Sequence, residues 1–372
     1  MKLTTLGSIA NRVRWALRDG PVRDLGWAFH RGLATRAARR ASAAVKIAIM
    51  TLRGRIDPQL VVGLDAFLSA TGPRGLAGIS DPVARREAFT ALMSASAVER
   101  PTEAGIAAED RLIAGPAGAP AVKVRVYHPQ AGCTPLPALY YIHGGGMVIG
   151  SIDTEDAIAR MLCAAVGCAA VSVEYRLAPE HPHPAPVEDC YAGLVWTVEN
   201  ADALGIDRRR IAIYGGSAGG GLAAATALLA RDRGGPPLIY QMLLYPMLDD
   251  RSDTSSCLEV DSIGVWDGWA NAEGWQALLG ARWGSDSVDP YAAPARATDL
   301  AGLPAAWIDV GELDSLRDED VLYALRMMQA GVPTELRVYA GAFHGWEVFV
   351  PDADISVRAV AERTAALRRV LA

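Results

Sequence analysis

A serine set between glycines is the first feature that could do chemistry. Residues 215–219 read G-G-S-A-G, a G-x-S-x-G pattern centred on Ser217. An apolar run at 211–214 comes before it, and a segment rich in small residues, 222–230, follows it. A strand, a sharp turn and a helix in this order expose a serine hydroxyl above a sheet. The alternative is an ordinary helix N-cap, so the prediction that Ser217 is a nucleophile depends on its partners.

A base is the first partner that such a serine needs. A hydroxyl is a poor nucleophile at neutral pH unless an imidazole takes its proton. The chain has six histidines, and His344 alone follows both Ser217 and a candidate acid, which is the order Ser, acid, His of α/β hydrolases. Residues 341–345 read G-A-F-H-G, so His344 lies in a loop flanked by glycines. We predict that His344 is the base, with a packed loop histidine as the alternative.

An acid must orient the imidazole and fix its tautomer. The apolar run at 305–310 reads as a strand that ends in Glu312 and Asp314, with Asp318 close behind. Sites of open α/β sheets lie at the carboxyl ends of strands, so this is a suitable place for the acid. We favour Asp314, and the other two carboxylates are then surface charges or helix caps.

A run of glycines supplies the third part of this chemistry. The apolar segment 137–142 reads as a buried strand and leads into residues 143–146, H-G-G-G. Glycines free backbone N–H groups to point at one spot, where they can bind the oxygen that gains charge during acyl transfer. The N–H of Ala218, directly after the serine, completes such an oxyanion hole. The alternative is a plain glycine turn, and His143 is expected to support the loop rather than bind metal.

Four blocks together resemble the bacterial hormone-sensitive-lipase-like esterases, also called family IV. They are H-G-G-G at 143–146, Y-R-L-A-P-E-H-P at 175–182, the serine motif at 215–219, and D-S-L-R-D-E at 314–319 with F-H-G at 343–345. The resemblance covers roughly residues 56–372. It implies an α/β-hydrolase fold with a helical cap and esterase activity on short- to medium-chain acyl esters. It also implies a triad and an oxyanion hole, formed respectively by Ser217, Asp314 and His344 and by the N–H groups of Gly145, Gly146 and Ala218.

Three positions depart from the usual family pattern without removing a catalytic atom. Gly216 stands where Asp or Thr is usual, Gly221 where Asn is common, and Ser315 where Pro is usual. These departures bear on the subfamily and so on substrate preference.

The pattern along the chain predicts one α/β domain, a mostly parallel sheet with helices on both faces. Apolar content of 51% and charged content of 21% fit a globular enzyme with a large core. Expected strands are 121–127, 136–142, 168–174, 210–214, 238–244, 305–310 and 334–339. Expected helices lie near 154–166, 187–203, 218–231, 319–330 and 353–371.

Two regions break this alternation and are predicted to be cap elements, near 56–110 and 247–302. The second holds four of the nine tryptophans, at positions 266, 269, 275 and 283. These rings could form a wall of the substrate pocket or build only the core of the cap. Both interpretations stay open.

The N-terminal residues 1–55 differ in charge from the rest of the chain. They hold 12 Lys and Arg against two acidic residues, a net charge of +10, whereas the remainder carries −16. Basic residues alternate there with apolar ones, which is typical of basic amphipathic helices. We favour a solvated flank that packs on the acidic body or extends the cap. Contact with an anionic membrane surface and a processing segment remain open.

Other function classes find little support. Five cysteines without a C-x-x-C spacing suggest reduced thiols and a cytoplasmic setting. No phosphate-binding glycine loop, apolar run long enough to span a membrane or nucleic-acid signature is present, and His181 with His183 lacks a third metal ligand. We expect no cofactor and no metal. The expected partner is a small-molecule ester, and a homodimer stays open.

The favoured function is therefore a serine carboxylesterase that works through an acyl-enzyme. The same triad could instead cleave lactone, amide or carbonate bonds. A different class is a small-molecule receptor on a hydrolase fold, against which the presence of His344 counts.

Overall fold

The computed structural model describes residues 52–98, 105–130 and 135–372. Residues 55–372 form one compact unit, which holds every predicted site residue. A basic extension is predicted for residues 1–55, and residues 1–51 of it lie outside the described residues.

An eight-stranded sheet forms the centre of this unit, in the order β1-β2-β4-β3-β5-β6-β7-β8. The β1–β2 and β2–β4 pairs are antiparallel and all other pairs are parallel, which agrees with the predicted mostly parallel sheet. The strands are β1 (Ile106–Ile113), β2 (Val122–Pro129), β3 (Leu136–Ile142), β4 (Ala169–Glu174), β5 (Ile206–Gly216), β6 (Tyr240–Leu244), β7 (Ala305–Leu313) and β8 (Thr334–Phe343).

Strand β1 was not predicted from the sequence. It lies at the edge of the sheet, and only its terminal residues Ile106 and Ile113 are buried while the six between them are exposed. With little surface to bury, the strand lacks the apolar alternation that marks a half-buried strand. The cap region predicted near 56–110 is therefore wrong for residues 106–110, which belong to the sheet.

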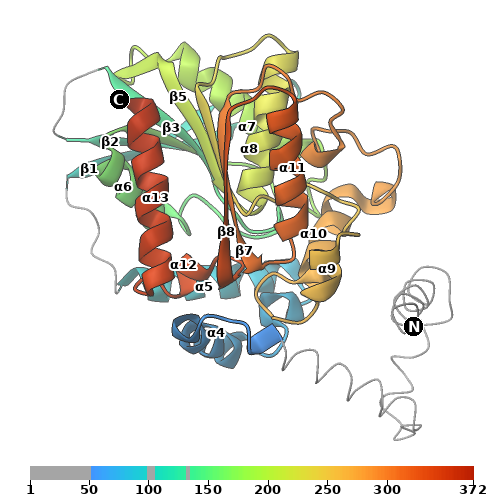
Figure 1. Ribbon diagram of the computed structural model, residues 1–372. Helices are drawn as coiled ribbons and strands as arrows, with labels where there is room; N and C mark the ends of the chain where they lie inside the picture. The colour runs from blue at the N-terminus through green and yellow to red at the C-terminus, as the bar shows by residue number, and fades with distance from the viewer. Residues whose placement is uncertain (1–51, 99–104, 131–134) are drawn as a thin grey trace, which may run out of the picture. The chain divides into compact units, whose positions relative to one another are not determined.

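Helices cover both faces of the sheet, as predicted. Figure 1 shows α6 (Asp156–Val166) and α13 (Asp354–Leu371) along one face, and α7 (Ala185–Glu199), α8 (Ala218–Asp232) and α11 (Arg317–Gln329) along the other. Helix α8 follows the serine motif and is buried along almost its whole length. Its glycines and alanines allow this close approach to the sheet, since a methyl group on Gly219 would lie 2.1 Å from the carbonyl oxygen of Ile142 in β3.

Further helices complete the unit, and those labelled at the bottom of Figure 1 lie at the carboxyl end of the parallel strands. The first group precedes the sheet in the chain and consists of α4 (Pro58–Thr71), η2 (Gly75–Gly78) and α5 (Pro82–Val98). The second follows β6 and consists of α9 (Ser255–Glu259), α10 (Gly268–Leu279), η3 (Gly280–Arg282) and η4 (Pro294–Arg296). The short helix α12 (Trp346–Phe349) follows β8.

The strand register brings two predicted motifs together. Ile142, the last residue of β3, pairs with Gly215 of β5, and Gly216 pairs with Leu244 of β6. The glycine loop after β3 and the serine turn after β5 therefore begin side by side.

Candidate active site

Ser217 occupies a strained turn between β5 and α8. Its φ of 57° and ψ of −123° lie in a region that L-residues with side chains rarely adopt. The flanking glycines are required by space, because a Cβ on Gly219 would lie 2.1 Å from the Ile142 carbonyl oxygen and one on Gly215 would lie 2.2 Å from that of Gly219. The turn thus presents the serine above the sheet, as the motif predicts.

The structure places the two other predicted triad residues in line with this serine. His344 Nε2 lies 2.9 Å from Ser217 Oγ, and His344 Nδ1 lies 2.7 Å from Asp314 Oδ2. Because a carboxylate only accepts, Nδ1–H is the donor and Nε2 is free to accept the serine proton. Asp314 is fully buried, and the serine and histidine are each 7% exposed.

The competing carboxylates have other contacts. Glu312 accepts hydrogen bonds from Arg55 and from the Gly341 N–H, and these contacts lower its pKa. Asp318 accepts from the Ser256 N–H and pairs with Arg317. Of the three carboxylates that the sequence left open, Asp314 is the one within reach of the imidazole.

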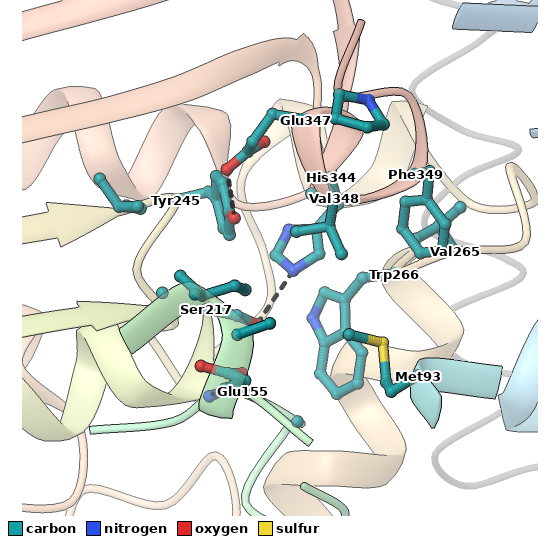
Figure 2. Close-up of a pocket in the computed structure, with 18 of the residues that line it drawn as sticks. Met93, Glu155, Ser217, Tyr245, Val265, Trp266, His344, Glu347, Val348 and Phe349 are labelled. Atoms are coloured by element: carbon teal, nitrogen blue, oxygen red, sulfur yellow. Dashed lines mark hydrogen bonds between the residues drawn. The ribbon is translucent and has the colours of Figure 1, made fainter. Parts of the chain in front are cut away.

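Tyr245 and Glu347 flank the imidazole. The Tyr245 ring packs edge-on against His344 at 4.8 Å between centroids, and its hydroxyl donates to Glu347 Oε1 at 2.7 Å (Figure 2). Trp266 lies on the other side, 6.1 Å from the His344 ring. Sequence reasoning did not select either Tyr245 or Glu347.

A buried network of ion pairs lies next to Tyr245 and Glu347. Arg363 of α13 donates through Nε and Nη2 to Asp309 and through Nη1 to Glu347, at 2.6, 2.9 and 2.6 Å. Burial lowers the pKa of Arg363, but the two carboxylates more than offset this and hold it well above its usual range. Asp309 lies near the end of the apolar run 305–310, and a carboxylate in a buried strand needs a hydrogen-bonding or cationic partner, which is the sequence signal that could have revealed this network.

The glycine loop carries free N–H groups next to the serine. In the part of the chain that the structure describes, the N–H groups of Gly145, Gly146 and Ala218 donate to no protein acceptor. Gly145 and Gly146 have φ of 113° and 61°, and side chains there would run into Ile149 and Trp266. Unpaired donors beside a nucleophile are what an oxyanion hole requires.

His143 supports this loop from beneath. Its ring stacks on Tyr175 at 4.2 Å, and its Nδ1–H donates to the Gly144 carbonyl at 2.8 Å. Burial lowers the pKa of His143, so the ring stays neutral.

Glu155 is a further loop contact that sequence reasoning missed. Its Oε1 accepts the Gly144 N–H at 2.8 Å, and its Oε2 accepts the Tyr141 hydroxyl. It stands at the N-cap of α6, within a stretch whose charges gave no signal of a role.

These groups open into one cavity of about 400 Å³. Its walls come from the carboxyl ends of β3, β5 and β6, from α6, α13 and the glycine loop, and from the helices beyond the strand ends, and they are mostly apolar. Of the four tryptophans in the second predicted cap region, Trp266 lines the cavity, Trp275 is buried in the core, Trp269 is 54% exposed and Trp283 donates to the Asp250 carbonyl. The pocket-wall interpretation thus holds for Trp266 and not for the other three.

The residues considered for other chemistry lie apart from this cavity. His183 Nε2 lies 3.0 Å from Asp289 Oδ2, and no group of three or more His, Cys, Asp or Glu side chains among the described residues is arranged to hold a metal. Cys163, Cys168, Cys190 and Cys257 are buried free thiols, and Cys133 lies outside the described residues. Within the described ranges, no helix is long and apolar enough to cross a membrane.

Known proteins resemble the chain along most of its length. The model of a family described as having the alpha/beta hydrolase fold matches residues 139–348. Carboxylesterase NlhH of Mycobacterium tuberculosis is 39% identical over 258 residues, which covers 67% of this chain and 79% of that protein. Esterase LipI of the same organism is 38% identical over 275 residues, covering 70% and 82%. The solved structure of a bacterial heroin esterase aligns with a TM-score of 0.80 at 41% identity, covering 86% of this chain and 99% of that one.

The fold and this similarity confirm the α/β-hydrolase prediction. The chain belongs to the hormone-sensitive-lipase-like carboxylesterases of the α/β-hydrolase family.

Proposed function

We propose that this chain is a serine carboxylesterase in which Ser217, His344 and Asp314 form the catalytic triad. One observation carries the proposal: a continuous series of hydrogen bonds runs from Asp314 through His344 to Ser217. The series ends in a cavity beside three N–H groups that have no acceptor among the described residues. The esterase names of relatives with 37–39% identity support the same activity.

The first half of the reaction forms an acyl-enzyme. Ser217 Oγ attacks the ester carbonyl carbon while His344 Nε2 takes its proton. The carbonyl oxygen becomes negatively charged and is bound by the N–H groups of Gly145, Gly146 and Ala218. The tetrahedral intermediate then collapses, the bond to the alcohol oxygen breaks, and His344 returns its proton to the leaving alkoxide.

The second half releases the acid. A water molecule loses a proton to His344 Nε2 and attacks the acyl carbon, and the same oxyanion hole stabilises the second intermediate. Its collapse frees the carboxylic acid and returns the proton to Ser217. Asp314 holds the imidazole in the required tautomer and stabilises the imidazolium in both halves.

Short- to medium-chain acyl esters suit the volume of the cavity. A space of about 400 Å³ lies within the usual range for small-molecule sites and is mostly apolar. Lactone, amide and carbonate bonds need the same catalytic groups, so they stay alternative substrates. A receptor role is disfavoured because His344 lies within hydrogen-bond reach of the serine.

Hydrolysis of a graded substrate panel tests this proposal. Purified full-length protein would be assayed with p-nitrophenyl esters of increasing acyl length, together with a lactone, a carbonate and an anilide. We expect kcat/KM to be highest for a short or medium acyl ester and to fall for long chains. Turnover of the anilide, lactone or carbonate above every ester would contradict the ester assignment, and no turnover of any substrate would favour a receptor.

We further propose that residues 56–372 form the catalytic domain and that residues 1–55 are a basic extension of it. The helices within 56–98 and 247–302 would form its cap. The charge of +10 in residues 1–55 motivates a test of membrane contact. Sedimentation with anionic vesicles, compared between the full chain and a variant that starts at residue 56, distinguishes contact from its absence.

A further inference from the structure

The cavity has two chemically different sides. Figure 2 shows Met93, Val265, Trp266 and Phe349 on one side of the Ser217–His344 pair, and Glu155, Tyr245 and Glu347 on the other. An ester bound at the serine must extend in both directions, one part from the acyl carbon and one from the alcohol oxygen. The two parts of a well-fitted substrate should therefore differ in polarity.

The polar side carries an excess of negative charge. Besides His344, the charged side chains that line the cavity within the described part of the chain are Glu155, Glu347 and Arg363. Arg363 is shared between Glu347 and the buried Asp309 behind it. Burial raises the pKa of Asp309, but even with Asp309 set aside the two glutamates outnumber the single guanidinium.

Glu155 is the carboxylate that this arrangement leaves without a cation. Its hydrogen bonds come from an amide N–H and a phenol hydroxyl, and no salt bridge in the described ranges includes it. A carboxylate has about four acceptor positions, so these two bonds leave room for more. A methyl group on Gly144 would lie 3.4 Å from Glu155 Oε1 and 3.6 Å from Ser217 Cβ, which places the carboxylate within about 7 Å of the serine.

We infer that this enzyme selects amphiphilic esters with an apolar part and a cationic part, and that Glu155 is a specificity-determining residue. The inference rests on the proposed esterase function and names its substrate class. A cationic group on the polar side gains from the unpaired carboxylate in a cavity with low-dielectric walls, where charges act strongly. The same field disfavours anionic esters and favours departure of the carboxylate product.

Matched esters that differ only in charge test the inference on the full-length protein. The first pair is choline butyrate and its carbon isostere, in which a tert-butyl group replaces the trimethylammonium group. A second pair carries the same two groups at the far end of the acyl chain of a butyl ester, because either part can face Glu155. We expect kcat/KM for the cationic ester to exceed that for its isostere roughly tenfold in at least one pair.

Two variants assign the effect to Glu155. Glu155→Gln keeps a carbonyl oxygen for the Gly144 N–H but removes the charge, and we expect the cationic-to-neutral ratio to fall severalfold. Glu199→Gln makes the same change on the exposed end of α7 and should leave the ratio unaltered. Since the ratio compares two substrates of one protein, a general loss of activity does not obscure it.

The possible results distinguish failure of this substrate preference from failure of the proposed esterase activity. Equal rates within both pairs in the parent enzyme would overturn the inference while leaving the esterase function intact. A ratio that survives Glu155→Gln would show that Glu155 only holds the glycine loop. Failure to hydrolyse even the neutral esters would instead contradict the proposed function.

Discussion

The serine turn and the acid–histidine side of the site are positioned by different physical means. At the turn, backbone packs directly on backbone, and a side chain on Gly219 would overlap the Ile142 carbonyl. On the other side, His344 is held by side-chain hydrogen bonds and ring contacts with Asp314, Tyr245 and Trp266. Further carboxylates, Glu319 and Asp320, are buried close to Asp314.

Because of this difference, the two regions should tolerate different kinds of substitution. A position fixed by steric contact fails when atoms are added, whereas a position fixed by polar groups fails when a partner or a charge is removed. The serine turn should therefore be sensitive to size and the acid–histidine side to charge. Five substitutions test this contrast, and they follow in order of decreasing expected effect.

Removing the nucleophile should have the largest effect. Ser217→Ala deletes the attacking oxygen and leaves the glycines of the turn in place, so we expect kcat to fall about a million-fold with little change in unfolding free energy. Steady-state ester hydrolysis and urea unfolding measure the two quantities. A variant within tenfold of the parent rate would remove Ser217 from the mechanism.

Removing the charge that orients the imidazole should come next. Asp314→Asn is expected to lower kcat about ten-thousand-fold, because the amide can donate to Nδ1 and stabilise the wrong tautomer. Asp318→Asn is the matched control, since that carboxylate contacts Ser256 and Arg317 instead. Equal losses in the two variants would argue against the orienting role of Asp314.

Breaking the buried ion network should affect stability more than rate. Arg363→Met leaves Asp309 and Glu347 buried without their cation, which is expected to lower the unfolding free energy by about 3–5 kcal/mol. Arg358→Met, on the exposed surface of the same helix, serves as the control in urea unfolding. A decrease in unfolding free energy below about 1 kcal/mol would mean that Asp309 and Glu347 become protonated in the variant at little cost in stability.

Adding one methyl group tests the steric half of the comparison. Gly219→Ala should destabilise the protein by about 3 kcal/mol, since its Cβ has no space between two carbonyl oxygens. Gly216→Ala is the control within the same turn, because the nearest atom to its Cβ is 3.5 Å away on Tyr245. Thermal unfolding measures the loss of stability in both variants. Equal losses in the two variants would contradict the steric explanation.

The smallest expected effect depends on pH. Burial raises the pKa of Asp320 well above its usual range, and neither carboxyl oxygen has a hydrogen-bond partner in the described part of the chain. A pKa that is higher in the folded state means that the parent loses stability as pH rises above about 4, the unfolded value. Asp320→Asn removes this loss, so its advantage in unfolding free energy should grow from pH 4 to pH 8. A constant difference would show that Asp320 ionises freely.

The sequence predicted the parts of this molecule that follow local rules. All seven expected strands and five expected helices are present within a few residues, because buried strands and small-residue helices carry strong patterns. Strand β1 was not predicted because an exposed edge strand has no such pattern. The sequence favoured Asp314 over Glu312 and Asp318, and the structure places Asp314 within hydrogen-bond distance of His344.

Residues that act through long-range contacts could not be predicted. Glu155, at the N-cap of α6, meets Gly144 in the loop after β3 only once the chain is folded, and Arg363 reaches Asp309 across 54 positions of the chain. Neither has a spacing or motif that marks it. Charged residues at such positions resemble solvated surface residues until the fold is known.

Labelling with a fluorophosphonate probe, followed by peptide mass spectrometry, shows whether Ser217 is an activated nucleophile. Such a probe reacts with a serine only where a base activates it and an oxyanion hole accommodates the product. We expect a single modified residue, Ser217, in the parent and no labelling in Ser217→Ala. Modification of another residue, or labelling that persists in the variant, would contradict the account.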